Sequence, residues 1–308
     1  MARPYRAPNC PWSIAMINRV LEIATEGAFV SKRYGSITIV VKNSEPTVVP
    51  IDTIDSLIMH QGASITTTCI EALSSSGAAI IFCNGKHMPS SIVLPLVGYH
   101  GQAARQRLQI EMSEPFKKRV WSYIVERKIA QQSRVVELTT GKRTLHRYMG
   151  PVRSGDPENK EAQAARAYWP ELFGRKFLRD GHEGPINARL NFGYAIIRSC
   201  VSRAVVACGL LPSLSVHHSD ARNAFALVDD IMEPYRPAID LQVLRLAEQG
   251  QALDTQSKSV LASSVISTIT TDRGATTLGA CILRTVQSFA HAIETKSPAI
   301  WYPESVIS

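Results

Sequence analysis

The chain has 308 residues, of which 45% are hydrophobic and 19% charged, and its formal net charge is +8. A chain of this size can bury one large core or two ordinary ones, and we expect two domains. No apolar run reaches the roughly 18 residues that a membrane helix needs, and the N-terminus lacks the apolar centre of a signal peptide. These features predict a soluble cytoplasmic protein without membrane association.

The first hundred residues have the texture of a β-rich domain. Short runs rich in β-branched residues, separated by turn residues, predict strands over 28–30, 36–41, 47–51 and 56–59. Ser64 is positioned to cap a helix that ends at Leu73, and a buried strand is expected over 78–83. We therefore predict a small N-terminal β-rich domain over residues 1–97.

The pattern becomes helical after that point. Apolar residues recur every four positions from Leu108 to Ile124, with basic residues between them, and Pro115 should kink this helix or begin a new one. Further helices are expected over 161–173, 185–211, 221–248 and 260–294, with a loop over 143–160. The predicted fold class is α+β: the β-rich domain is followed by a larger all-α catalytic domain over residues 98–308.

Cysteine spacing and charge distribution narrow the class of function. Six cysteines are scattered without a CxxC pair, which argues against a zinc knuckle or a disulfide scaffold. The positive charge is concentrated in residues 101–200, which carry 19 Lys and Arg against 10 Asp and Glu. A basic region attracts polyanions, of which nucleic acid is the commonest, although a solvated basic face is the alternative.

One segment combines imidazoles and acids in a way that suggests a metal site. His217 and His218 are adjacent, and Asp230 and Glu233 follow closely, three residues apart and so on one face of a helix. Glu161, at the start of a predicted helix, is a further candidate. Mg²⁺ and Mn²⁺ prefer oxygen ligands, and Mn²⁺ also accepts an imidazole.

Each candidate also has a purely structural interpretation. An acid in the first turn of a helix complements the helix dipole, which would explain Glu161. The histidines could be ordinary loop residues, and the acid pair could cap a helix or bind Arg236. Spacing alone leaves these alternatives open.

Four longer strings add a family resemblance. They are KEAQAARAYW (160–169), INARLNFGYAIIRS (186–199), GLLPSLSVHHSDARNAFALVDDIMEPYRPAID (209–240) and, more weakly, VERKIAQQ (125–132). In this order they resemble the CRISPR-associated adaptation integrases, the Cas1 family, most closely the type II branch that accompanies RNA-guided single-effector systems. The resemblance spans nearly the whole chain, including the order of its β-rich and helical parts.

The resemblance implies a set of site residues. The three metal ligands of the family fall on Glu161, His218 and Glu233, with His217 and Asp230 in supporting roles. Ala162 stands where the family usually has glycine, and His218 fits the family's spacing to the second acid better than His217. Asp230 is expected either to hold Arg236 or to support the site.

The resemblance also implies an activity and partners. The family binds Mg²⁺ or Mn²⁺, cuts DNA, and inserts spacer DNA into the CRISPR array by attack of a 3′-hydroxyl on a phosphodiester. It binds double-stranded prespacer and repeat DNA, forms homodimers through the N-terminal domain, and works with a small Cas2-family partner that bridges two dimers. The same is expected here.

Other residues have two readings each. Asn187, Asn191 and Tyr194 share one helix face, and either line the catalytic cleft or make hydrogen bonds in the core. Phosphate contacts are possible at four arginines, for which a structural ion pair is the alternative: Arg166, Arg189, Arg222 and Arg236. A set of four aromatic residues favours core packing over base stacking: Tyr168, Trp169, Phe173 and Phe177.

Two other functions compete with the integrase. One is a nucleic-acid-binding protein in which the acids are structural. The other is a metal-dependent phosphoesterase that acts on small phosphate esters. Substitution of Glu161 or Glu233 should change binding or stability but not DNA joining in the first case, and activity on nucleotides should persist without the basic region in the second.

Overall fold

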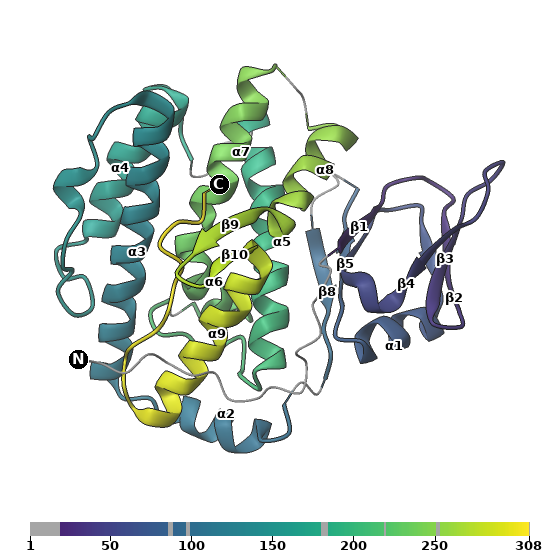
Figure 1. The fold of residues 1–308 in the computed structure, drawn as a ribbon, viewed down its shortest axis with the longest axis horizontal. Helices are drawn as coiled ribbons and strands as arrows, with labels where there is room; N and C mark the ends of the chain where they lie inside the picture. Colours follow the sequence, from purple (N-terminus) through teal and green to yellow (C-terminus); the bar gives the residue numbers. More distant parts are fainter. Residues whose placement is uncertain are drawn as a thin grey trace.

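The computed structural model describes residues 19–85, 89–96, 99–179, 184–218, 220–250 and 253–307. A β-rich region is followed by a helical region, as predicted (Figure 1). The expected boundary between residues 97 and 98 lies outside the described residues. No helix within the described ranges is long and apolar enough to cross a membrane.

Two four-stranded sheets form the β-rich region. One has the order β1-β5-β7-β8 and the other β4-β3-β2-β6. The strand bounds, in chain order, are β1 Arg19–Ile23, β2 Phe29–Arg33, β3 Ser36–Val40, β4 Thr47–Pro50, β5 Ile54–Met59, β6 Ser64–Ile65, β7 Ala79–Cys83 and β8 Pro89–Val93. Helix α1 (Thr67–Ser75) is capped by Thr66, whereas Ser64, the predicted cap, lies in β6.

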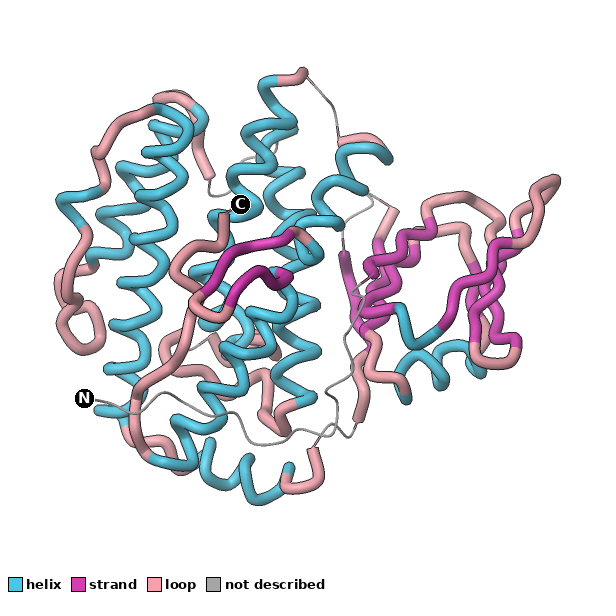
Figure 2. The backbone as a smooth tube through the Cα atoms, in the orientation of Figure 1, coloured by secondary structure: helices cyan, strands magenta, loops and turns pink. Residues whose placement is uncertain are grey.

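The first sheet is sandwiched between the second sheet and the helices (Figure 2). Its strands β1, β5 and β7 run parallel, and every residue of the central strand β5 is buried. Because side chains alternate along a strand, Leu57 and Met59 join the core shared with the second sheet, while Ile58 and Ile81 join the core of the helical region. Asp55 on β5 also pairs with Arg203 of the helical region. The two regions therefore share a buried face.

The helical region begins with α2 (Gln102–Ile110) and α3 (Glu114–Thr140). Pro115 begins α3 and does not kink it, since Ser113 caps the helix and accepts a hydrogen bond from the amide of Phe116. The remaining helices are α4 Lys160–Phe173, α5 Pro185–Ala207, α6 Ala226–Met232, α7 Arg236–Glu248, α8 Thr255–Ser263 and α9 Leu278–Thr295. Gly193 lets α5 approach α7 closely, because a Cβ there would clash with Ile239.

Two of the predicted helices were too long. The segment 221–248 begins its helix only at Ala226 and is interrupted by a short 3-10 helix, η3 (Glu233–Tyr235). The segment 260–294 contains a hairpin of β9 (Thr268–Thr271) and β10 (Gly274–Thr277) between α8 and α9. Its β-branched threonines favour strand pairing over helix, so the continuous helix predicted over 260–294 is wrong.

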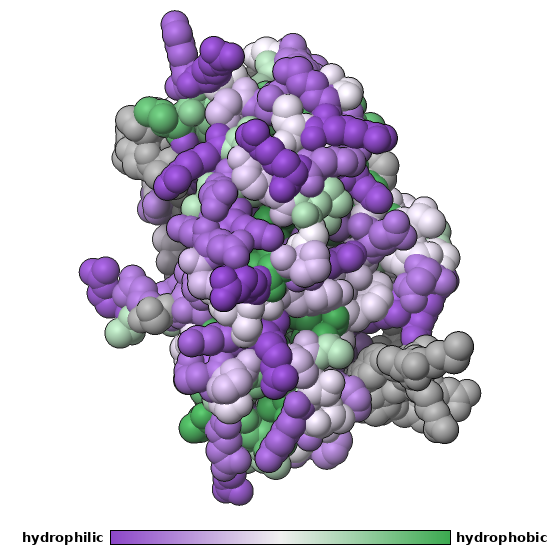
Figure 3. Space-filling view, turned by 90° about the vertical axis from the view of Figure 1, so that its left-hand side faces the viewer, coloured by the Kyte–Doolittle hydropathy of each residue, from purple (hydrophilic) through white to green (hydrophobic). Residues whose placement is uncertain are grey.

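The described cysteines agree with a reduced protein. Five are buried and form no disulfide within the described residues, and Cys10 lies outside them. The face that carries α3 and α4 is largely hydrophilic, with only separate small apolar areas (Figure 3).

Candidate metal centre

The first acid is held at the beginning of α4. Asp156 precedes the helix and accepts hydrogen bonds from the backbone amides of Lys160 (2.8 Å) and Glu161 (3.0 Å). Asn159 caps the same helix by accepting from the amide of Ala162. These bonds satisfy amides that have no partner within the helix and so fix where Glu161 projects.

Glu161 and Glu233 meet at a single lysine. Lys128 of α3 donates a hydrogen bond to Glu161 Oε1, with Nζ 2.6 Å away, and the same Nζ lies 2.6 Å from Glu233 Oε2. The ammonium of Lys128 therefore bridges the two carboxylates. Burial would lower the pKa of Lys128, but the charges of Glu233 and Glu161 outweigh burial and raise it.

Glu233 is ionised inside the protein because cations surround it. Its side chain is 4% exposed, and Arg236 lies 3.0 Å from its other oxygen. Burial alone would raise the pKa of Glu233, but Arg236 and Lys128 together lower it below the ordinary value. A buried, charged carboxylate is a strong ligand for a cation.

Asp230 holds the histidine loop against α6. Its carboxylate accepts hydrogen bonds from the backbone amides of Val216 (2.8 Å), His217 (2.9 Å) and His218 (3.3 Å). It also binds His218 Nδ1. Of the two expected roles for Asp230, supporting the site is therefore the one seen, since Arg236 pairs with Glu233 instead.

The two histidines have different surroundings. His217 stacks on the indole of Trp121, with ring centroids 4.0 Å apart, and burial lowers its pKa. The hydrogen bond to Asp230 raises the pKa of His218 against the effect of burial. Because Asp230 accepts from Nδ1, the neutral His218 ring presents its Nε2 as an acceptor.

The chemistry of these groups fits a divalent cation. Two carboxylates and an imidazole suit Mn²⁺, and the acids suit Mg²⁺. An imidazole whose other nitrogen binds a carboxylate is the usual state of a metal-ligating histidine. In this structure Lys128 supplies the positive charge between the two acids. Among the described residues, no three acidic, histidine or cysteine side chains lie close enough together to hold a metal ion. A metal ion bound by both acids would have to displace Lys128.

The four candidate arginines differ in position. Arg236 belongs to the site, and Arg222 is exposed and pairs with Asp220. Arg166 is exposed on the outer side of α4. Arg189 of α5 is 5% exposed, and burial lowers its pKa; whether it contacts DNA stays a prediction.

The three polar residues predicted on one face of α5 bind different partners. Asn187 and Asn191 both accept hydrogen bonds from Arg179, which ties the segment before α5 to that helix. Tyr194 donates a hydrogen bond to Asp240 of α7, and Tyr168 of α4 donates another (2.8 Å). Burial raises the pKa of Asp240 to about 6, despite both hydroxyls, which lower it.

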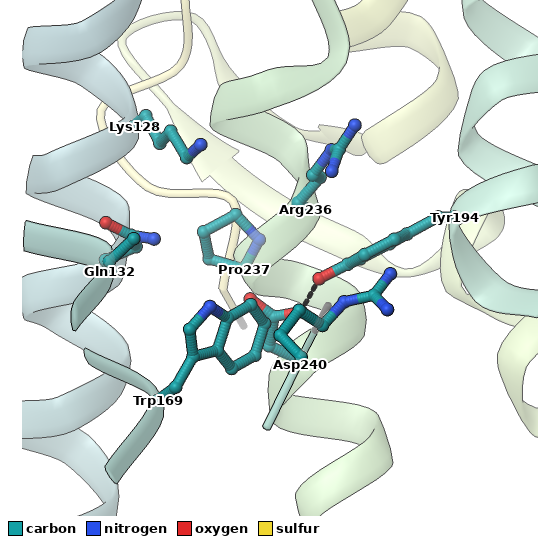
Figure 4. Close-up of a pocket in the computed structure, with 9 residues that line it drawn as sticks. Lys128, Gln132, Trp169, Tyr194, Arg236, Pro237 and Asp240 are labelled. Atoms are coloured by element: carbon teal, nitrogen blue, oxygen red, sulfur yellow. Dashed lines mark hydrogen bonds between the residues drawn. The ribbon is translucent and has the colours of Figure 1, made fainter. Parts of the chain in front are cut away.

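A pocket of about 290 Å³ opens beside Lys128 and Arg236, the two cations that contact Glu233 (Figure 4). It lies among α3, α4, α5 and α7, and Lys128 and Arg236 join it to the Glu161–Glu233 pair. Its lining residues are Lys128, Gln132, Ala165, Trp169, Arg179, Tyr194, Arg236, Pro237 and Asp240. Of the predicted aromatic set, Tyr168 is buried, while the partly buried Trp169, Phe173 and Phe177 pack on the core.

Sequence reasoning missed Lys128, Gln132, Arg179 and Asp240. Lys128 and Gln132 lie within the string VERKIAQQ, which was noted only as a weak part of the resemblance. Asp240 ends the string that carries the second acid. Nothing in the spacing of Arg179 indicates its contact with α5.

Comparison with known proteins settles the family. The family model described as CRISPR associated protein Cas1 matches residues 21–271, most of the chain. The chain belongs to this family. A curated CRISPR-associated endonuclease Cas1 from Neisseria meningitidis serogroup C is 39% identical over 214 residues, which are 68% of this chain and 70% of that protein. This relative supports the predicted type II branch. Another Cas1 endonuclease, from Pyrobaculum aerophilum, is 28% identical over 238 residues, 70% of this chain and 80% of that protein.

Solved structures show the same fold. A casposase bound to integration product has a TM-score of 0.72 at 17% identity, covering 92% of each chain. A Cas1 protein from Thermotoga maritima has a TM-score of 0.72 at 15% identity, covering 90% of this chain and 97% of that one. A Cas6-RT-Cas1–Cas2 complex has a TM-score of 0.73 at 15% identity, where this chain covers 37% of the longer polypeptide. The predicted fold class is confirmed.

Proposed function

We propose that the chain is a metal-dependent DNA endonuclease and integrase of CRISPR adaptation, which inserts spacer DNA into the array in the prokaryotic cytoplasm. The observation that carries this proposal is the meeting of Glu161 and Glu233, from distant segments, at Lys128, beside a histidine that Asp230 holds. Membership of the Cas1 family and the fold shared with a DNA-joining casposase complex support it.

The residues divide the chemistry between them. Glu161, Glu233 and the Nε2 of His218 would hold Mg²⁺ or Mn²⁺, and Asp230 keeps the imidazole in the required tautomer. When bound, the metal would polarise the scissile phosphate and lower the pKa of the attacking hydroxyl. Lys128, once released by the acids, and Arg236 are close enough to neutralise a phosphate of the DNA.

The reaction is a transesterification. The oxygen of a DNA 3′-hydroxyl forms a new bond to phosphorus in the repeat, and the bond from that phosphorus to the former 3′-oxygen breaks. The hydroxyl proton leaves the nucleophile, and a proton reaches the leaving oxygen. With water as nucleophile, the same groups would cut DNA.

Partners follow from the family resemblance. We expect a homodimer formed through the β-rich region, double-stranded prespacer and repeat DNA as substrates, and a small Cas2-family protein that bridges two dimers. The named complexes among the structural neighbours include Cas1–Cas2 and Cas1–DNA assemblies, which support this expectation.

The test is strand transfer of a labelled prespacer into a plasmid that carries the repeat, with the purified small partner. Joining should need Mg²⁺ or Mn²⁺ and stop with a chelator. Glu161→Gln, His218→Ala and Glu233→Gln should each lower the rate at least about a hundredfold, because each removes a ligand. His217→Ala is the matched control and should retain most activity, since His217 stacks on Trp121.

Circular dichroism should show that the variants remain folded. Glu161→Gln is the cleanest of them, because its side chain is 25% exposed. Normal joining by a folded Glu161→Gln variant would overturn the proposal. DNA binding without any metal-dependent joining would favour the binding protein, and metal-dependent hydrolysis of small phosphate esters alone would favour the phosphoesterase.

A further inference from the structure

The segment 297–307, which follows α9, runs beside α3 and is bound to it by side chains (Figure 1). Gln131 of α3 donates a hydrogen bond to the carbonyl of Glu304 (3.0 Å) and accepts one from a backbone amide of the same segment. Arg127, one helical turn earlier, donates to the carbonyl of Pro303 (2.7 Å). Because residues four apart lie on one face of a helix, these two side chains hold the segment against α3 together.

The same segment also reaches the turn that carries Glu233. Tyr302 is 4% exposed, and its hydroxyl donates a hydrogen bond to the carbonyl of Ile231, 3.1 Å away. Its ring packs near Tyr123 of α3 and Tyr235 of η3, with ring centroids 6.2 and 5.7 Å away. Burial raises the pKa of Tyr302, so its hydroxyl keeps the proton that it donates.

The carbonyl of Ile231 lies where the helix changes its form. Helix α6 ends at Met232, and the 3-10 helix η3 begins at Glu233. In a 3-10 helix each N–H donates to the carbonyl three residues earlier, but Pro234 has no N–H to donate to Ile231. The Tyr302 hydroxyl supplies a donor to that carbonyl and so supports the break at which Glu233 leaves α6.

We infer that Tyr302 is a positioning residue for Glu233, and that the segment 297–307 sets the spacing between Glu233 and α3. The inference rests on the proposed function, in which Glu233 is a metal ligand. Arg127, which holds the segment, directly precedes Lys128, whose Nζ lies 2.6 Å from Glu233. Both partners of this ion pair are therefore fixed to one segment. A ligand that is held in place loses less freedom on binding and binds a metal ion more tightly.

The test is a titration of the whole chain with Mn²⁺, without DNA, in which electron paramagnetic resonance measures the free ion. Tyr302→Phe removes the hydroxyl and keeps the ring, and it should weaken Mn²⁺ binding about tenfold. The midpoint of urea unfolding without metal should fall only slightly, because one neutral hydrogen bond is lost.

Ser288→Ala is the matched control. Ser288 of α9 accepts a hydrogen bond from the amide of Trp301, 2.8 Å away and next to Tyr302 in the chain. Its loss loosens the segment from α9 but not from the turn that carries Glu233. The urea midpoint should fall about as much as in Tyr302→Phe, while Mn²⁺ affinity should stay within about twofold of the wild type.

A double-mutant cycle shows whether Tyr302 acts through Glu233. In a Glu233→Gln background, Tyr302→Phe should weaken the residual Mn²⁺ binding by less than about twofold, because the ligand that it positions is already lost. In a Glu161→Gln background, the same change should still weaken binding about tenfold, since Glu161 lies on another element.

Unchanged Mn²⁺ affinity in Tyr302→Phe, or a tenfold loss that persists in the Glu233→Gln background, would overturn the inference. Failure here is distinct from failure of the proposed function. A wild type that binds Mn²⁺ and joins DNA, with a Tyr302→Phe variant of equal affinity, would remove the positioning role but keep the integrase. A tenfold loss in a protein that never joins DNA would keep the positioning role and remove the integrase.

Discussion

Two buried acids, seven residues apart on η3 and α7, are accommodated in opposite ways. Glu233 is 3% exposed and Asp240 is 1% exposed. Glu233 lies against Lys128 and Arg236, and these cations hold its pKa below the ordinary value. Asp240 accepts from two tyrosine hydroxyls, and burial raises its pKa to about 6.

This difference in surroundings determines which acid is suited to be a metal ligand. A neutral hydroxyl compensates only part of the cost of burying a charge, whereas an adjacent cation compensates more of it. Glu233 therefore stays charged, as the proposed role of metal ligand requires. Asp240 has both oxygens occupied and is suited to fixing Tyr168 and Tyr194 in place. Asp240 and Tyr194 line the pocket.

Lys128→Met should have the largest effect on the difference between Glu233 and Asp240. It removes the cation between Glu161 and Glu233 and leaves a buried carboxylate with Arg236 alone, so the free energy of unfolding should fall by about 3–4 kcal/mol without metal. Because no ammonium then has to be displaced, Mn²⁺ should raise the stability of the variant more than that of the wild type. Urea unfolding with and without Mn²⁺ measures both effects.

Lys117→Met is the matched control on the same helix. Lys117 pairs with the exposed Glu114, and its loss should change the free energy of unfolding by less than about 0.5 kcal/mol. Equal stabilisation of wild type and Lys128→Met by Mn²⁺ would show that Lys128 does not compete with the metal.

Asp240→Asn tests the contrast through the pH dependence of stability. The folded-state pKa of Asp240, about 6, lies above its ordinary value of 3.8, so the folded protein binds this proton more tightly than the unfolded chain does. The stability that the proton contributes is full below about pH 4 and is lost as pH rises toward 6. The wild type should therefore lose about 2–3 kcal/mol relative to Asp240→Asn across this window.

Asparagine is a fair replacement because its oxygen can accept from one tyrosine hydroxyl while its nitrogen donates to the other. Urea unfolding of both proteins between pH 4 and 7 gives the difference. Parallel stability curves would mean that Asp240 has the same proton affinity in the folded and unfolded states.

The contrast also shows how far sequence reasoning reaches. Local patterns predicted β2, β3, β4, β5 and β7, most helices and the α+β order, because burial and capping leave periodic signals. They did not predict β1, β6 or β8. The family strings predicted Glu161, His218 and Glu233, and the structure brings the two acids to one lysine. Whether these residues bind metal stays a prediction.

What the sequence did not indicate depends on long-range contacts. Lys128 looked like one of many basic residues on an amphipathic helix, and only the fold places it between acids from other segments. No role was predicted for Asp240, because the two tyrosines that enclose it come from α4 and α5, far from it in the sequence. The hairpin of β9 and β10 was read as helix, because its short threonine-rich strands interrupt a longer apolar pattern.

Tyr168→Phe should have the smallest effect, because it removes only one of the two hydroxyls that bind Asp240. It removes one of two hydrogen bonds to a buried carboxylate and should cost about 1 kcal/mol at pH 7. Because that bond favours the charged form of Asp240, its loss should raise the pKa further and move the pH window of the stability loss upward. Tyr235→Phe is the matched control: Tyr235 is equally buried but bonds to Thr285, 2.6 Å away, so its loss should cost a similar free energy. A shift of the window in Tyr235→Phe, or none in Tyr168→Phe, would show that the hydroxyl of Tyr168 does not control the proton on Asp240.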